Sequence, residues 1–382
     1  MQVKSTNYIP HLDLLRLVAA LMIIFLHAYE AWCGWFGQVG LLSNGTYKDL
    51  SYWGKVIDQI IRNFGIGVDV FFLISGFLIT YLLLVEKKTM GNISIWRFLV
   101  RRSLRIWPLY FLIVVLGPFL VFWLKEPRPA YLENIFFLGN FNIIATQKWV
   151  YPYSHLWSIC IEEHFYLIWP FLISFVPVKR LLNVFLGLIL LSISFRMWAW
   201  SSYDNGWYYV FTHTLSRMDI LVIGAIGGYY HAQNPIVFCL TRIQRWLIFG
   251  VLILSLCIEP VVAWDTLFDV AFKKYIYISL FTILMLDFLF NSTYNHFLKD
   301  KSILHYFGKI SYGIYMFGNV LLLLIIKKVV LNFGITNLWI YFTLIFLVSI
   351  IVPIISYEFF EKPILKFSAR FRMDNYTKSM RI

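Results

Sequence analysis

Two ionisable side chains that can take part in chemistry lie inside the first hydrophobic segment, LDLLRLVAALMIIFLHA. Arg16 and His27 are eleven residues apart, so a helix places them within about 20° of each other on one face and about 16 Å apart along its axis. An arginine binds phosphate oxygens, and a histidine accepts and releases protons near neutral pH. Because ionisable groups inside a membrane span are costly and usually functional, the pair predicts a working site. The alternative is an Arg16 that reaches the lipid surface and a His27 that is hydrogen-bonded to a neighbouring helix.

A carboxylate and three further charges are predicted near the depth of His27. The stretch HLWSICIEEHFYLIWP carries Glu162, about 10 Å below the outer membrane surface if depth follows the rise of a helix. Asp69, Arg217 and Asp219 fall in the same zone of other hydrophobic segments. Five ionisable residues at one level predict a polar, water-accessible chamber, and scattered buried ion pairs are the alternative.

A cluster of arginines is predicted at the opposite, inner side of the membrane. The stretch IWRFLVRRSLRIWPLY carries Arg101, Arg102 and Arg105, and their three- and four-residue spacings bring Arg105 onto a helix face with the other two. Planar, permanently charged guanidinium groups suit phosphate oxygens. With Arg16 at the same depth, these residues predict a site for a phosphate-bearing ligand. A basic flank at the cytoplasmic end of a helix is the alternative.

The composition is that of a polytopic membrane protein. Of the 382 residues, 60% are hydrophobic and only 14% are charged, whereas a soluble domain is nearer half apolar and a quarter charged. We interpret the net charge of +13 as attraction to anionic lipid headgroups, and we expect no nucleic-acid partner. The four cysteines show no C-x-x-C spacing, so we expect neither a disulfide framework nor a bound metal.

Hydrophobic runs long enough to cross a bilayer predict an all-α protein with about ten transmembrane helices. The predicted spans cover residues 12–31, 64–85, 103–124, 156–177, 182–200, 209–230, 246–264, 274–290, 308–331 and 336–358. Lys and Arg are about twice as frequent in the loops on the side of the two ends, which predicts that both termini are cytoplasmic. We expect a single transmembrane domain over residues 1–382, with a basic cytoplasmic tail at about 362–382.

In this order, these elements resemble the acyltransferase family 3 of membrane O-acyltransferases. The family opens with an arginine, ten residues and a histidine, as at Arg16 and His27, and continues with GVDVFFLISGFLI. Its RxxxRIxPxY pattern and its R-x-x-R pair are matched from Arg101 to Tyr110, and its WSL-x-x-E-x-x-FY pattern appears as WSICIEEHFY. The RMDILVIGA, GKISYGIYM and YEFFEKP segments are similar to family elements as well. Many relatives carry a histidine where this chain has Gly318 and Asn319, so no role is carried over to that position.

The resemblance implies transfer of an acyl group, most often acetyl, from acyl-CoA to a hydroxyl of a carbohydrate or glycolipid, in the bacterial cytoplasmic membrane. We expect Arg16, Arg101, Arg102 and Arg105 to hold the phosphates of acetyl-CoA on the cytoplasmic side. His27 is the expected general base, because histidine suits proton transfer at neutral pH, and Glu162 is expected to orient it. The expected acceptor-binding residues are Asp69, Trp157, Tyr166, Arg217 and Asp219.

A transporter or flippase of a polar or anionic solute is the alternative, because a polar chamber in the membrane would serve it equally well. The chain shows no inverted repeat and no paired broken helices of the kind that many transporters show. An arginine cluster joined to a histidine and a glutamate is what an acyl-CoA enzyme needs, and this combination favours the enzyme. For the tryptophans and tyrosines near the outer surface, an interfacial aromatic belt is the alternative to sugar stacking.

Overall fold

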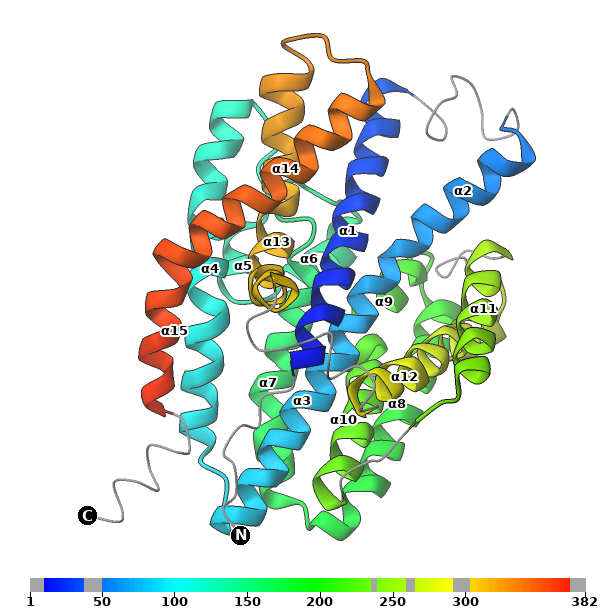
Figure 1. Ribbon diagram of the computed structural model, residues 1–382, viewed down its shortest axis with the longest axis vertical. Helices are drawn as coiled ribbons and strands as arrows, with labels where there is room; N and C mark the ends of the chain where they lie inside the picture. The colour runs from blue at the N-terminus through cyan, green and yellow to red at the C-terminus, as the bar shows by residue number, and fades with distance from the viewer. Residues whose placement is uncertain (1–9, 38–49, 235–238, 259–264, 291–302, 372–382) are drawn as a thin grey trace.

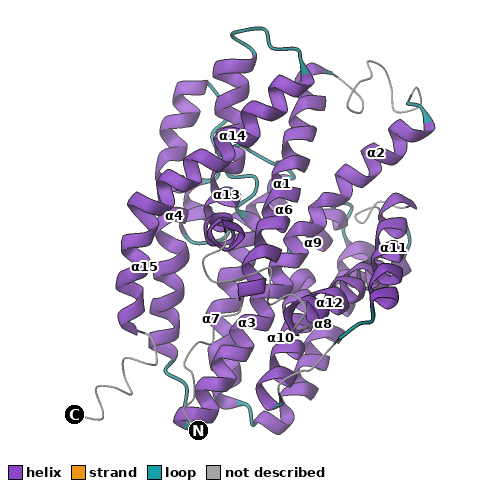
Figure 2. Cartoon of the chain, viewed as in Figure 1, coloured by secondary structure: helices purple, strands orange, loops and turns teal. Residues whose placement is uncertain are grey.

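The computed structural model describes residues 10–37, 50–234, 239–258, 265–290 and 303–371, and in these ranges helices are joined by loops, with no strand (Figure 2). The long helices are α1 (Pro10–Phe36), α3 (Ile66–Met90), α4 (Ile95–Leu124), α7 (Trp157–Phe175), α8 (Leu181–Ser202), α10 (Thr214–Gln233), α11 (Arg242–Ile258), α12 (Lys274–Phe290), α13 (Ile303–Ile325) and α14 (Leu338–Ser356). The shorter ones are α2 (Tyr52–Arg62), α5 (Tyr131–Ile135), α6 (Gly139–Thr146), α9 (Gly206–Thr212) and α15 (Lys362–Ser368).

Each of the ten predicted spans falls on one of the long helices, but the count of ten is not confirmed. Seven helical stretches in the described ranges are long and apolar enough to cross a membrane, and they contain α1, α3, α4, α8, α10, α13 and α14. The other three are shorter: α7 has 19 residues, and α11 and α12 have 17 each. Residues 259–264 of the seventh span, both chain ends and residues 372–382 of the predicted tail lie outside the described residues.

Helix α2 is an element that hydropathy alone did not predict, within the segment between the first two spans. Its sequence, YWGKVIDQIIR, is amphipathic, and Ser51 caps its first turn by accepting a hydrogen bond from the Gly54 amide at 3.1 Å. The buried Asp58 of α2 accepts a hydrogen bond from Tyr29 of α1 and ion-pairs with Arg62 at 2.9 Å. This contact fastens α2 to α1 near His27.

The closest helix packing joins α3 to α10 and α1 to α13 (Figure 1). Glycines allow this approach, since they let two backbones come together without a side chain between them. A Cβ added to Gly76 of α3 would lie 1.8 Å from the carbonyl oxygen of Leu221 in α10, and one added to Gly308 of α13 would lie 2.4 Å from Asp13 of α1. Arg16 and His27 are therefore carried by a helix that is tightly held near its N-terminal end.

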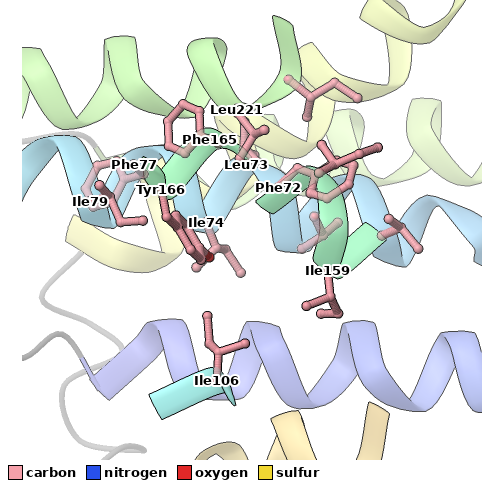
Figure 3. Close-up of a cluster of buried hydrophobic side chains, with 14 of the residues drawn as sticks. Phe72, Leu73, Ile74, Phe77, Ile79, Ile106, Ile159, Phe165, Tyr166 and Leu221 are labelled. Carbon is pink, nitrogen blue, oxygen red and sulfur yellow. The ribbon is translucent and has the colours of Figure 1, made fainter. Parts of the chain in front are cut away.

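The largest apolar cluster lies between α3, α7 and α10 and borders the site. Figure 3 shows Phe72, Leu73, Phe77 and Leu221 packed together, all buried. Ile159 and Tyr166 of α7 extend from one side, and Ile106 of α4 from the other, toward the same space (Figure 3). These three residues also line a cavity, so the core ends where the polar site begins.

Candidate functional site

One cavity brings together side chains from α1, α3, α4, α7 and α13. Its polar lining consists of Arg16, Ser75, Arg102, Arg105, Ser158, Glu162, Tyr166, Ser311, Tyr312 and Tyr315. Its apolar lining consists of Val68, Phe71, Phe72, Ile106 and Ile159. Five residues predicted for the site therefore face one space, although they come from three segments far apart in the sequence.

The carboxylate of Glu162 is held at the side of this cavity by two hydroxyl groups. Ser75 Oγ donates a hydrogen bond to Oε1 at 2.8 Å, and the Tyr166 hydroxyl donates to Oε2 at 2.8 Å. The Tyr166 hydroxyl also lies 3.2 Å from Ser75 Oγ. Because both carboxylate oxygens accept from these neighbours, Glu162 is oriented by α3 and by its own helix.

The guanidinium groups that face the cavity have few carboxylate partners. Arg16 Nη1 lies 3.5 Å from Asp13 Oδ1 in the preceding turn. Arg102 rests on the Phe98 and Tyr166 rings, 5.7 and 5.6 Å from their centroids. Within the described part of the chain, neither Arg102 nor Arg105 ion-pairs with a carboxylate. Two guanidinium groups are thus available to an anionic ligand in this cavity.

Arg101 faces away from the cavity, although it was predicted with this cluster. Its Nη2 lies 3.3 Å from Glu86 Oε2, and its Nη1 donates to the Phe371 carbonyl at 2.8 Å. The reason is the helix period, because residue 101 is turned about 100° from residue 102. Arg101 therefore fastens the end of the described C-terminal segment to α3 and α4.

His27 lies at the other end of α1, outside the cavity lining. Its Nδ1 lies 3.3 Å from Glu30 Oε2, one helical turn further along, and its side chain is 27% exposed. Since α1 is continuous from residue 10 to residue 36, His27 stands about 16 Å from Arg16 along the axis, as expected.

The predicted contact between His27 and Glu162 is corrected by the packing of α1 on α3. A Cβ on Gly65 would touch Leu26, the neighbour of His27. Ser75, which holds Glu162, is ten residues further along the chain in α3. This corresponds to about 15 Å along the helix axis. Glu162 therefore lies at the level of the arginines rather than at the level of His27.

The predicted chamber of five charges is divided into separate pairs. Arg217 Nη2 donates to Asp69 Oδ1 at 2.6 Å, and both side chains are buried. The Arg217 guanidinium also lies 5.8 Å from the Trp157 ring centroid and 5.4 Å from that of Phe211. This pair joins α3 to α10 beside aromatic rings near the start of α7.

Asp219 belongs to a different network, in which it and its two cationic partners are buried, and it does not line the cavity. It ion-pairs with Arg196 at 2.5 Å and with Lys274 at 2.8 Å, and it accepts a hydrogen bond from Tyr275. Arg196 also donates to the carbonyls of Val270 and Ala271, at 3.0 and 3.1 Å. The prediction of Asp219 as an acceptor-binding residue is thus replaced by a contact that joins α8, α10 and α12.

Comparison with known proteins identifies the family. The model of the acyltransferase domain family called acyltransferase 3 matches residues 9–358. The chain belongs to this acyltransferase family. The O-acetyltransferase OatA of Staphylococcus aureus is 28% identical over 390 aligned positions, which cover 95% of this chain and 58% of that protein. The peptidoglycan O-acetyltransferase OatA of Listeria monocytogenes is 32% identical over 205 positions, covering 49% of this chain and 28% of that protein.

The chain thus spans somewhat more than half the length of the S. aureus relative. No solved structure matches the chain. With its seven candidate spans and bacterial relatives, this member of the family is an integral membrane protein of bacterial type. Among the residues that the structure describes, no group of three His, Cys, Asp or Glu side chains could hold a metal ion.

Several residues of the candidate site were not predicted from the sequence. Asp13 and Glu30 each lie three residues from a predicted site residue, a spacing that places them on the same helix face. Ser75 lies in the GVDVFFLISGFLI segment, but the sequence did not indicate which carboxylate it contacts. His155 precedes α7 and is buried, with Nε2 3.0 Å from the Met316 carbonyl. Burial lowers the pKa of His155 to about 3, which makes it a poor proton acceptor at neutral pH.

Proposed function

We propose that the protein is a membrane O-acetyltransferase that moves an acetyl group from acetyl-CoA to a hydroxyl of a carbohydrate acceptor. The observation that carries this proposal is the cavity in which Arg16, Arg102 and Arg105 meet while two of the three have no carboxylate partner among the described residues. Unpaired guanidinium groups in a cavity favour a ligand with several phosphate oxygens. Family membership and the printed names of the relatives support the reaction class.

The two ends of α1 suit the two halves of the reaction. In the predicted orientation the arginine cavity is at the cytoplasmic end of α1, where acetyl-CoA would meet the protein, and His27 lies about 16 Å away along the helix. The pantetheine arm separates the phosphates of CoA from its thioester, so a donor held by the arginines can present its acetyl group further along α1. His27 then lies where the acceptor hydroxyl has to be activated.

In the proposed reaction, an acceptor hydroxyl oxygen attacks the thioester carbonyl and forms the new ester bond. The carbon–sulfur bond breaks, and CoA leaves as the thiol. His27 accepts the hydroxyl proton as general base and returns it to the departing sulfur. No net proton or electron is gained or lost.

Glu162 takes a different part from the one expected. Held by Ser75 and Tyr166, its carboxylate faces the same cavity as Arg16 and Arg102 and adds a negative charge beside these cations. We therefore propose that Glu162 acts on donor binding. Trp157 and the pair formed by Asp69 and Arg217 remain the proposed contacts of the carbohydrate, because aromatic faces and paired charges recognise sugar rings and hydroxyls. The Listeria relative's name makes peptidoglycan one acceptor to test.

The proposal is tested by measuring acetyl-CoA binding and thiol release by the purified protein in detergent. Arg105→Ala should weaken acetyl-CoA binding, because Arg105 lines the cavity without a carboxylate partner. His27→Ala should retain acetyl-CoA binding but lose thiol release, because His27 lies outside the cavity. Folded wild-type protein that does not bind acetyl-CoA would contradict the proposal and favour a transporter.

A further inference from the structure

The carboxylate nearest to His27 belongs to its own helix. Glu30 lies one turn after His27, with Oε2 3.3 Å from His27 Nδ1. Both side chains are partly open, 27% for His27 and 43% for Glu30, so a substrate can reach the pair. An exposed ion pair of this kind contributes little to folding stability. Such a pair instead selects the tautomer of the imidazole. When Nδ1–H donates a hydrogen bond to the carboxylate, Nε2 is left as the proton acceptor.

Glu162 is not positioned to accept a hydrogen bond from His27. Both of its oxygens accept from Ser75 and Tyr166, and it lies about 15 Å deeper than His27, by the rise along α3. The other histidine near His27 is His155, which is held by the Met316 carbonyl. His155 also lies close enough to His27 for their charges to interact.

The surroundings of Glu30 form a polar cluster apart from the arginine cavity. Arg62 and Tyr151 both lie within electrostatic range of the Glu30 carboxylate. Arg62 is itself held by Asp58, to which Tyr29 donates a hydrogen bond. The amphipathic helix α2 is therefore fastened beside the His27–Glu30 pair.

We propose that Glu30 is the positioning residue of this site: it fixes His27 with Nδ1 protonated and directs Nε2 toward the acceptor hydroxyl. This inference rests on the proposed function, in which His27 is the general base. It assigns to Glu30 the role that the sequence had suggested for Glu162. It also places the acceptor on the side of α1 that carries α2 and the loop before α7.

The first test is spectroscopic and needs no substrate. Nitrogen-15 NMR of histidine-labelled full-length protein in detergent reports which imidazole nitrogen carries the proton, and His27→Ala identifies the His27 signals. With Glu30 present, the His27 signals should be those of a protonated Nδ1 and an unprotonated Nε2. Glu30→Gln should shift the population away from this tautomer, and unchanged signals would overturn the proposal.

The second test is kinetic and compares Glu30→Gln with Glu162→Gln. With acetyl-CoA and chitotriose as probes, Glu30→Gln should lower kcat at least about tenfold, with acetyl-CoA affinity unchanged. Glu162→Gln should instead weaken acetyl-CoA affinity. Glu358→Gln is the matched control, because Glu358 forms an exposed helical ion pair with Lys362 outside the site; it should change neither quantity.

A double-mutant cycle separates positioning from a general structural effect. In the His27→Ala background, Glu30→Gln should cause no further loss of activity, because the residue on which it acts is gone. Equal losses in both backgrounds would overturn the proposal. Failure of the proposed function itself looks different, because wild-type protein would then bind no acetyl-CoA. The NMR test would still report on the His27–Glu30 pair.

Discussion

Asp69 of α3 and Arg217 of α10 form a buried ion pair, with 2.6 Å between Asp69 Oδ1 and Arg217 Nη2. Asp69→Asn would leave the guanidinium buried without its counter-charge. Breaking a buried pair in this way costs about 3–5 kcal/mol, so the melting temperature in detergent should fall clearly. Glu358→Gln, which breaks an exposed pair, should leave the melting temperature nearly unchanged. An Asp69→Asn protein of normal stability would contradict the structural role of this pair, whereas reduced acceptor affinity would support its proposed contact with the carbohydrate.

The glycine at position 76 should be irreplaceable because it sets the spacing between α3 and α10. A Cβ there would lie 1.8 Å from the Leu221 carbonyl oxygen, a backbone atom that a rotamer change cannot move. Gly76→Ala should lower the free energy of unfolding by about 1–3 kcal/mol or more. Gly187→Ala on α8 meets nothing within 4 Å and is the matched control. The stability of Gly187→Ala should be unchanged or slightly raised. Equal melting temperatures for Gly76→Ala and Gly187→Ala would contradict the packing argument.

The two neighbouring arginines of α4 should respond differently to replacement by lysine. Arg102 faces the cavity, whereas Arg101 contacts Glu86 and the Phe371 carbonyl. Lysine keeps the charge but loses the planar fork that binds phosphate in two places. Arg102→Lys should therefore weaken acetyl-CoA binding about tenfold, equivalent to about 1.4 kcal/mol, while Arg101→Lys should leave it unchanged. Isothermal titration calorimetry measures both, and the reverse order would move the phosphate site to the other face of α4.

Loss of the Asp219 carboxylate should destabilise the protein more than loss of one of the two cations that pair with it. Asp219 is the shared partner of Arg196 and Lys274. Asp219→Asn leaves two buried cations without a counter-charge, whereas Lys274→Met leaves the Arg196–Asp219 pair intact. Asp219→Asn should therefore reduce the yield of folded protein more than Lys274→Met does, as measured by size-exclusion chromatography. If Asp219→Asn folds normally and loses only acceptor binding, the assignment of Asp219 to a structural network fails.

The sequence alone located the helices and the family because both depend on properties that are local along the chain. Runs of apolar residues gave the position of every long helix, and the spacing of Arg16 and His27 gave their shared face on α1. Helix period also predicted that Arg102 and Arg105 lie on one face. The cavity brings these two residues together with Arg16, but it also brings in Glu162 and Tyr166, which the sequence had assigned to the opposite side of the membrane. The amphipathic helix α2 was missed because hydropathy over a long window averages its two faces.

Which charges face one another was decided only by the tertiary structure. Helix rise predicts depth along one axis, but it does not predict how far two packed helices are shifted or which face each presents. For α1 and α3 the close approach is at Gly67, where an added Cβ would lie 2.7 Å from the Ala19 carbonyl oxygen. As a result, Glu162 accepts a hydrogen bond from Ser75 at the level of the arginines. The carboxylate beside His27 is that of Glu30. Asp69, Arg217 and Asp219 likewise became separate ion pairs, because buried charges pair with the nearest counter-charge that close helix packing provides.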